Sequence, residues 1–126
     1  MIDLLTVKNV KFYGDETASV TLENENASVE VFCHLCEYSE GDKVNNLLRV
    51  LDADVRAAYL SDWPAEKIKE ASREWIRKTG PYSYKGIGRV IDENEGVIEV
   101  QGFRIEVGEL PCQGSVEFEI DRLDLW

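Results

Sequence analysis

The clearest structural signal in the chain lies at residues 19–31, which read SVTLENENASVEV. Val20 and Leu22 alternate with polar residues before a turn-prone polar run, and Val29 and Val31 alternate with polar residues after it. Alternation with a period of two residues is typical of a β-strand with one buried face. The two parts of this stretch therefore predict a β-hairpin.

The segments farther along the chain continue the β pattern. Residues 44–60 read as one bent, extended stretch, and residues 86–100 read as two strands around a polar turn. The parity of the apolar residues then changes at 101–102 and again within 120–123. A straight strand cannot place both sets on one face, so the first change indicates a bulge or a two-residue hairpin turn. Repeated changes of this kind favour a sheet that coils into a barrel.

One helix is expected, at roughly 64–79. Pro64 suits a first helical turn, and Gly80-Pro81 is a typical helix end. An apolar stripe at i, i+3, i+7 and i+8 predicts one face packed on the sheet. The stripe consists of Ile68, Ala71, Trp75 and Ile76.

Two pairs of segments look alike. Residues 23–25 and 93–95 both read Glu-Asn-Glu before a Val- and Ile-rich strand. Residues 49–52 read Arg-Val-Leu-Asp, and residues 122–124 read Arg-Leu-Asp. The similarity is open to two interpretations: an internal duplication of a strand unit, or the usual vocabulary of strands and acidic turns.

The order of these elements predicts a mostly β (α+β) fold. Strands, one helix and further strands match an OB-like, partly open β-barrel of about six or seven strands, plugged by the helix at roughly 64–79. The alternative is a two-sheet β-sandwich. We expect a single domain over residues 1–126, with a possible duplication of units at about 17–52 and 87–125 joined by the helix.

Acidic residues outnumber basic ones. The 126 residues contain 25 Asp and Glu against 14 Lys and Arg, a formal net charge of −11. This excess disfavours general binding to a nucleic-acid backbone or to anionic membranes. The charge is uneven, because residues 64–91 hold seven bases and three acids, a local charge of +4 that leaves −15 elsewhere. Nucleic acid is therefore expected, if at all, only at 64–91.

Cysteine and histidine are scarce. The three cysteines are an odd number and cannot all pair within the chain. Free thiols and an acidic N-terminal start, untypical of a signal peptide, predict a cytoplasmic protein. The run Cys33-His34-Leu35-Cys36 falls in an expected strand, where Cys33 and Cys36 face opposite sides, so we expect structural cysteines and no metal or cofactor. His34 is the only histidine and no nucleophile motif accompanies it, which disfavours an enzyme.

These features favour a non-enzymatic, acidic interaction protein that binds and occludes a basic partner protein, as an immunity-type inhibitor of a toxin does. The carboxylates expected to contact the partner lie in turns: Glu23, Glu25, Asp92, Glu93 and Glu95. The alternative is an OB-type module for single-stranded nucleic acid or another small anionic ligand, which would use a basic and aromatic strip. The strip consists of Arg73, Trp75, Tyr82, Tyr84, Lys85 and Arg89. The oligomeric state is left open by the sequence.

Overall fold

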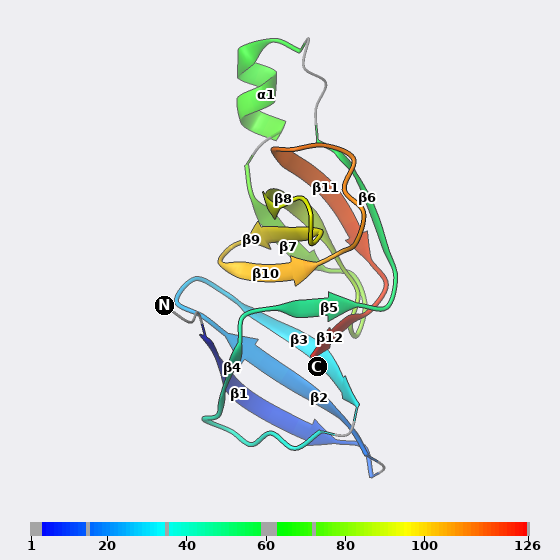
Figure 1. The fold of residues 1–126 in the computed structure, drawn as a ribbon. Coiled ribbons are helices and arrows are strands. Elements are labelled where there is room, and N and C mark those ends of the chain that lie inside the picture. Colours follow the sequence, from blue (N-terminus) through cyan, green and yellow to red (C-terminus); the bar gives the residue numbers. More distant parts are fainter. Residues whose placement is uncertain (1–3, 15, 35, 59–62, 72, 126) are drawn as a thin grey trace.

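Twelve strands and one short helix make up the described part of the protein (Figure 1). The structure is a computed structural model that describes residues 4–14, 16–34, 36–58, 63–71 and 73–125. In chain order the elements are β1 (Leu4–Phe12), β2 (Thr17–Glu23), β3 (Ser28–His34), β4 (Lys43–Asn45), β5 (Leu48–Val50), β6 (Ala53–Ala57), α1 (Ala65–Ala71), β7 (Trp75–Lys78), β8 (Tyr84–Asp92), β9 (Val97–Val100), β10 (Phe103–Glu106), β11 (Ser115–Ile120) and β12 (Leu123–Leu125).

All twelve strands belong to one mixed sheet. Its order is β4-β1-β2-β3-β12-β5-β10-β9-β8-β11-β6, and β7 pairs with β8 beside this path. The prediction of a mostly β fold is confirmed, and so is the hairpin at 19–31, which is β2 and β3. The predicted number of six or seven strands is too small, because the sheet of the described residues has twelve strands, and this sheet is not closed into a barrel. The alternative of two separate sheets is also wrong, because hydrogen bonds join all of these strands.

The strand order reads the same from both ends once the strands of the two halves of the chain, β1 to β5 and β8 to β12, are treated as equivalent, and we call this symmetry the palindrome. When β1 to β5 are exchanged with β8 to β12, strand for strand, the order from β4 to β11 becomes its own reverse. The pairings obey the same relation, because β3 is parallel to β12 just as β10 is parallel to β5. The register shift between Val7 and Asn9 in β1 is matched by the shift between Val90 and Asp92 in β8. Each half therefore places its fifth strand in the sheet of the other half.

The two halves meet along a bent, two-stranded ribbon. β6 pairs with β11 and β5 pairs with β12 in one continuous antiparallel register. Between them the Leu51 N–H donates to the Arg122 carbonyl (3.0 Å) and the Asp121 N–H donates to the Asp52 carbonyl (2.9 Å). The parity change expected within 120–123 is this bend. The change at 101–102 is a two-residue hairpin turn, in which Gln101 and Gly102 both have positive φ.

The predicted helix is wrong in length and position. It covers only Ala65–Ala71, and Trp75–Lys78 form a strand instead. β7 pairs with Tyr84–Ile87, and Gly86 allows the close approach, since a Cβ there would lie 2.0 Å from the Trp75 carbonyl oxygen. Tertiary pairing of aromatic and β-branched residues thus overrides the helical spacing. No helix of the described residues is long and apolar enough to cross a membrane.

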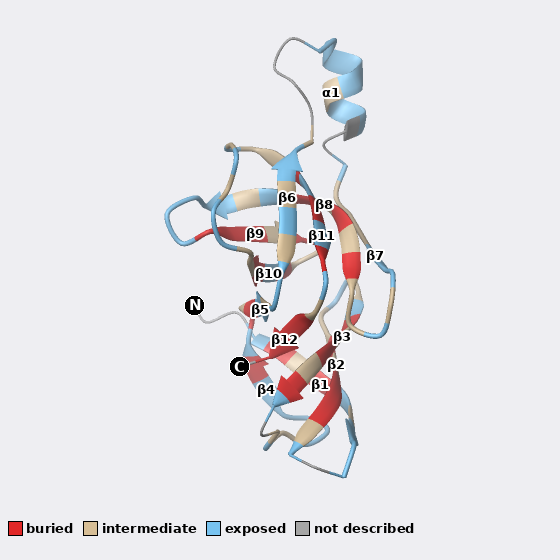
Figure 2. Cartoon of the chain, turned by 90° about the vertical axis from the view of Figure 1, so that its right-hand side faces the viewer, coloured by how far each residue is buried: buried red, intermediate tan, exposed pale blue. Residues whose placement is uncertain are grey.

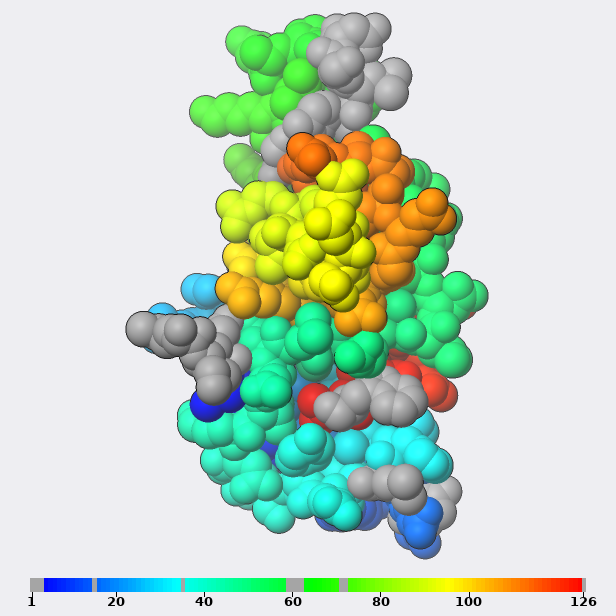
Figure 3. All heavy atoms as spheres, viewed as in Figure 1, coloured from blue at the N-terminus to red at the C-terminus, as the bar shows by residue number. Residues whose placement is uncertain are grey.

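The helix does not plug the sheet. It forms a lobe at one end of the elongated molecule (Figures 1 and 3), and most of its described residues are exposed. The buried side chains come from strands of both halves instead (Figure 2). The largest of those that are fully buried are Phe103, Phe118, Leu5, Leu22 and Leu48.

The palindrome bears on the possible duplication without establishing it. The similar segments 49–52 and 122–124 fall on β5 and β12 with their bends, which the relation exchanges. The segments 23–25 and 93–95 instead begin the β2–β3 and β8–β9 turns, which it does not exchange. Duplication stays a prediction, and its units would be β1–β5 and β8–β12 with β6, α1 and β7 as the connection.

Candidate functional site

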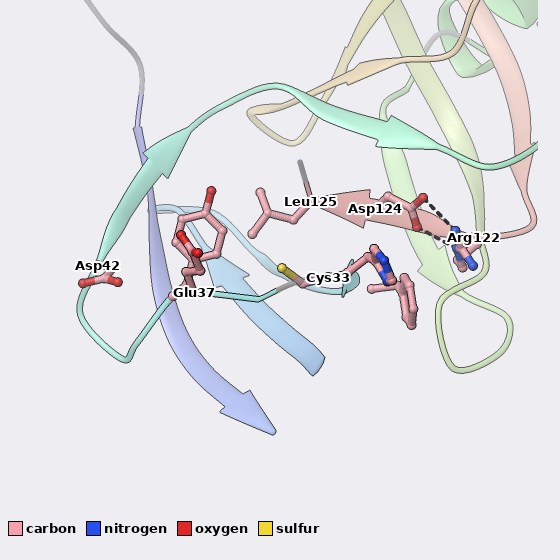
Figure 4. A pocket seen from close by; sticks show the side chains of 9 residues that line it. Cys33, Glu37, Asp42, Arg122, Asp124 and Leu125 are labelled. Atoms are coloured by element: carbon pink, nitrogen blue, oxygen red, sulfur yellow. Dashed lines mark hydrogen bonds and ion pairs between the residues drawn. The ribbon is translucent and has the colours of Figure 1, made fainter. Parts of the chain in front are cut away.

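A large pocket lies where β3 and β12 end (Figure 4). It has a volume of about 740 Å³ and is bounded on the far side by the connection between β3 and β4. Apolar groups form its inner wall, and Glu37 and Asp42 stand at its edge. The lining residues are Phe32, Cys33, His34, Glu37, Tyr38, Asp42, Arg122, Asp124 and Leu125.

A buried ion pair fixes one wall of this pocket. Arg122 donates to Asp124 through two bonds, Nε to Oδ1 at 2.8 Å and Nη2 to Oδ2 at 3.1 Å. The Asp124 side chain is only 6% exposed, whereas that of Arg122 is 33% exposed. The guanidinium also lies 4.3 Å from the centre of the Phe32 ring, a cation–π contact. The two residues are two positions apart in an extended segment, so their side chains reach the same face.

Aromatic side chains extend this wall away from the pocket. Phe32 meets the Tyr82 ring edge to face, with the ring centres 5.6 Å apart. The Tyr82 hydroxyl shares a hydrogen bond with the Tyr13 hydroxyl. Burial, followed by this bond, raises the pKa of Tyr82 to about 12. Tyr82 is therefore a neutral, packed side chain at physiological pH.

Cys33 forms part of the inner wall and is not a reactive thiol. The pKa of Cys33 is raised from 9.0 to about 12, mainly by burial and secondly by a hydrogen bond with Cys36. A thiol acts as a nucleophile or metal ligand only as a thiolate, so Cys33 is suited to packing. No group of His, Cys, Asp and Glu among the described residues could hold a metal ion.

The expected geometry of the cysteine run needs one correction. The strand ends at His34, so the prediction that Cys33 and Cys36 face opposite sides of one strand is wrong. Cys36 lies in the connection after β3, where its N–H donates to the Glu16 carbonyl at 3.0 Å, and its thiol contacts that of Cys33. Leu35 lies outside the described residues. All three cysteines are free thiols.

The structure does not bring the five predicted carboxylates together. Glu23 and Glu25 border the β2–β3 turn, which contacts the β9–β10 turn through Asn24 Nδ2 and the Gln101 carbonyl (3.0 Å). Asp92, Glu93 and Glu95 belong to the β8–β9 turn, at the opposite end of β9. They do not form one acidic rim.

Several of these carboxylates also have local roles. Asp92 Oδ1 accepts the Glu95 N–H at 3.0 Å, and Glu93 Oε2 accepts from Gln113 at 2.6 Å. Glu23 lies 3.9 Å from the Lys8 ammonium. Stabilising their own turns is therefore one function that these acids already have.

The predicted basic and aromatic strip is divided among four places. Trp75 and Lys85 lie on the outer face of β7 and β8, and Arg89 lies farther along β8, where it pairs with Glu99 at 3.2 Å. Arg73 is exposed just before β7. Tyr82 belongs to the aromatic wall beside Phe32 described above.

The sixth residue of the strip lies in the core. Tyr84 is 4% exposed, and its hydroxyl both accepts the Glu30 N–H (2.7 Å) and donates to the Glu30 carbonyl (3.0 Å). Its hydrogen-bonding groups are thus committed to β3. Burial is the largest cause that raises the pKa of Tyr84 above its usual 10.0.

The pocket residues were not selected by sequence reasoning. Two signals could have pointed to them: the acidic run Glu37, Glu40 and Asp42 in one short connection, and the Arg122 and Asp124 pair at strand spacing. What the sequence lacks is the parallel pairing of β3 with β12, residues about 90 positions apart, which brings the ends of these two strands together at the pocket.

Comparisons with known proteins give no family for this chain. No family model matches it, and no curated protein or solved structure shows significant similarity to it.

Proposed function

We propose that the protein is a non-enzymatic, acidic binding protein that occupies and blocks a basic partner protein, as an immunity-type inhibitor does. The observation that carries this proposal is the lining of the pocket at the ends of β3 and β12. It holds three carboxylates, of Glu37, Asp42 and Asp124, against one guanidinium, that of Arg122, around an apolar wall. An apolar centre with a charged edge is the usual composition of a protein-binding surface.

The mechanism is occlusion. Arg122 is already neutralised by Asp124, so a partner meets the negative field of Glu37 and Asp42, with Glu40 in the same connection. Such a field speeds the association of a basic protein by electrostatic steering. The turn carboxylates at 23–25 and 92–95 add to this field from other parts of the surface.

The test is capture followed by kinetics. The immobilised protein is exposed to a native lysate at low salt, a captured protein is identified and purified, and its association rate is measured across ionic strength. We expect a basic partner whose association rate falls at least about tenfold between low and high salt. A rate that is independent of salt, or a captured set no more basic than the lysate, contradicts the proposal.

A second candidate function rests on the outer face of β7 and β8. Trp75, with Arg77 5.8 Å from its ring centre, lies next to Ile87, and Arg77 lies next to Lys85. Cations interleaved with an aromatic ring suit a single-stranded nucleic acid or another anion. An oligothymidylate should then quench tryptophan fluorescence and Lys85→Gln should weaken the effect. An unchanged titration would exclude this function.

The finer OB-like architecture is also a proposal. Each half combines four of its own strands with a fifth from the other half, β4-β1-β2-β3-β12 and β11-β8-β9-β10-β5. Five curved strands in a partly open arrangement correspond to the size of an OB-fold. Two such units that exchange their last strand would explain why the order of the expected elements matches an OB-like fold.

A further inference from the structure

The palindrome leaves one position in the sheet unfilled. β11 has β8 on one side and β6 on the other. Its counterpart β4 has β1 on one side, and no strand of the described residues pairs with its other edge. An unpaired strand edge is a template for a further strand.

The matching register shows where such a strand would lie. The shifts in β1 and β8 align Val7 with Val90, which places Leu5 opposite Val44 in one half and Gly88 opposite Val116 in the other. Val44 and Val116 are both buried. On the side of Val116 that faces away from Gly88 lies Ala57 of β6. The counterpart of Ala57 would therefore lie on the unpaired side of Val44.

The pocket lies beside this position. Beside β8 to β11, β6 follows the bend after β5, and its Ala53 and Val55 pack against the core. Beside β1 to β4, the corresponding place lies between the end of β12 and the connection into β4, where Leu125 and Asp42 face the pocket (Figure 4). The pocket is lined by Leu125 at the end of β12 and by Asp42 directly before β4, so a counterpart of β6 that led from the end of β12 to the edge of β4 would pass beside it.

The charges around the pocket and the side-chain pattern of β6 indicate what kind of segment would bind there. β6 packs Ala53 and Val55 against the core, while the charged side chains between and after them, Asp54 and Arg56, are exposed. The exposed charges around the pocket and β4 include three carboxylates, of Glu37, Glu40 and Asp42, against the ammonium of Lys43, which donates to Thr6 Oγ1. The balance is negative, so outward side chains of an occupant would be basic. We propose that an extended segment of a basic partner adds antiparallel to the free edge of β4 and places alternate small apolar side chains in the pocket. This inference rests on the proposed function and names its binding site.

The test uses two fluorescein-labelled peptides, KAKVKAK and KAKPKAK, with the full-length protein at low salt. They have the same charge, but proline cannot donate a backbone hydrogen bond and disfavours a continuous strand. Binding is followed by fluorescence polarisation, and the amide exchange of Lys43–Asn45 is followed by NMR. Glu37→Lys with Glu40→Lys is compared with Glu66→Lys with Glu109→Lys, which makes the same charge change at exposed sites elsewhere.

We expect KAKVKAK to bind at least about tenfold more tightly than KAKPKAK and to slow exchange in β4. The Glu37 and Glu40 double variant should weaken binding about tenfold, and the control variant less than about twofold. Equal binding of both peptides overturns strand addition but leaves the proposed function standing. Binding of neither peptide contradicts both. Self-association of the protein that the Glu37 and Glu40 variant abolishes would make a second copy the occupant and overturn the proposal.

Discussion

The ion pair beside the pocket gives the sharpest stability prediction. Arg122→Met keeps most of the aliphatic stem but removes the charge, and it leaves the Asp124 carboxylate, only 6% exposed, without its partner. Removing one partner of a buried pair typically costs about 3–5 kcal/mol. We expect about 3 kcal/mol from Arg122→Met, because the guanidinium is itself partly exposed and the carboxylate can gain some solvent.

Removing the other partner of the ion pair should lower the free energy of unfolding less. Asp124→Leu leaves Arg122 unpaired, but its side chain is 33% exposed and still contacts Phe32, so water can solvate the charge. We expect a loss of about 1 kcal/mol. The double variant removes both charges and should also lie within about 1 kcal/mol of the unmodified protein, because an apolar pair often replaces a buried ion pair at little cost.

The assay is urea unfolding of the four proteins, with the two single variants and the double variant completing a cycle. The expected coupling free energy between Arg122 and Asp124 is about 3–4 kcal/mol. Equal costs for the two single variants, or additive costs in the double variant, would refute the idea that Asp124 is the buried, dependent partner.

Two further predictions concern packing and thiol chemistry. Gly86→Ala should lower the free energy of unfolding by about 2 kcal/mol, because its Cβ would lie 2.0 Å from the Trp75 carbonyl oxygen; Gly88→Ala, with a closest approach of 3.1 Å, should cost clearly less, and equal urea midpoints would be inconsistent with the close approach of β7. Alkylation of Cys33 should be far slower than that of Cys112 at pH 8.5 and should rise about tenfold per pH unit toward pH 12, because the raised pKa keeps the thiol protonated. Labelling of Cys33 and Cys112 at the same rate would count against a buried thiol. For the same reason, the contribution of Cys33 to the free energy of unfolding is complete below pH 9 and is lost as the pH rises toward 12.

Local signals in the sequence were enough for the strand class and for the position at 101–102 where the strand pattern is interrupted. Alternation identified β2 and β3, because one face of this hairpin is buried. The parity change at 101–102 indicated a bulge or a two-residue turn, and the structure has the turn. These features depend on neighbours in the chain. A pattern of period two therefore reports them directly.

Long-range pairing explains what the sequence did not predict. Trp75–Lys78 have helical spacing with Ile68 and Ala71, yet they pair with β8 across a glycine that gives them room. Gly86-Ile87-Gly88 was the available signal, because glycine within a strand often marks a close backbone approach. The pocket depends on the parallel pairing of β3 and β12, for which local patterning carries no information.

The most direct test of a basic partner at the acidic pocket is an NMR titration of the isotopically labelled protein with KAKVKAK at low salt. The proposal predicts that the largest shift changes fall on Glu37, Tyr38, Asp42 and the β4 residues Lys43–Asn45, and that they disappear at high salt. Shift changes centred on the outer face of β7 and β8 or on the turn at 92–96, or no changes at all, would contradict it.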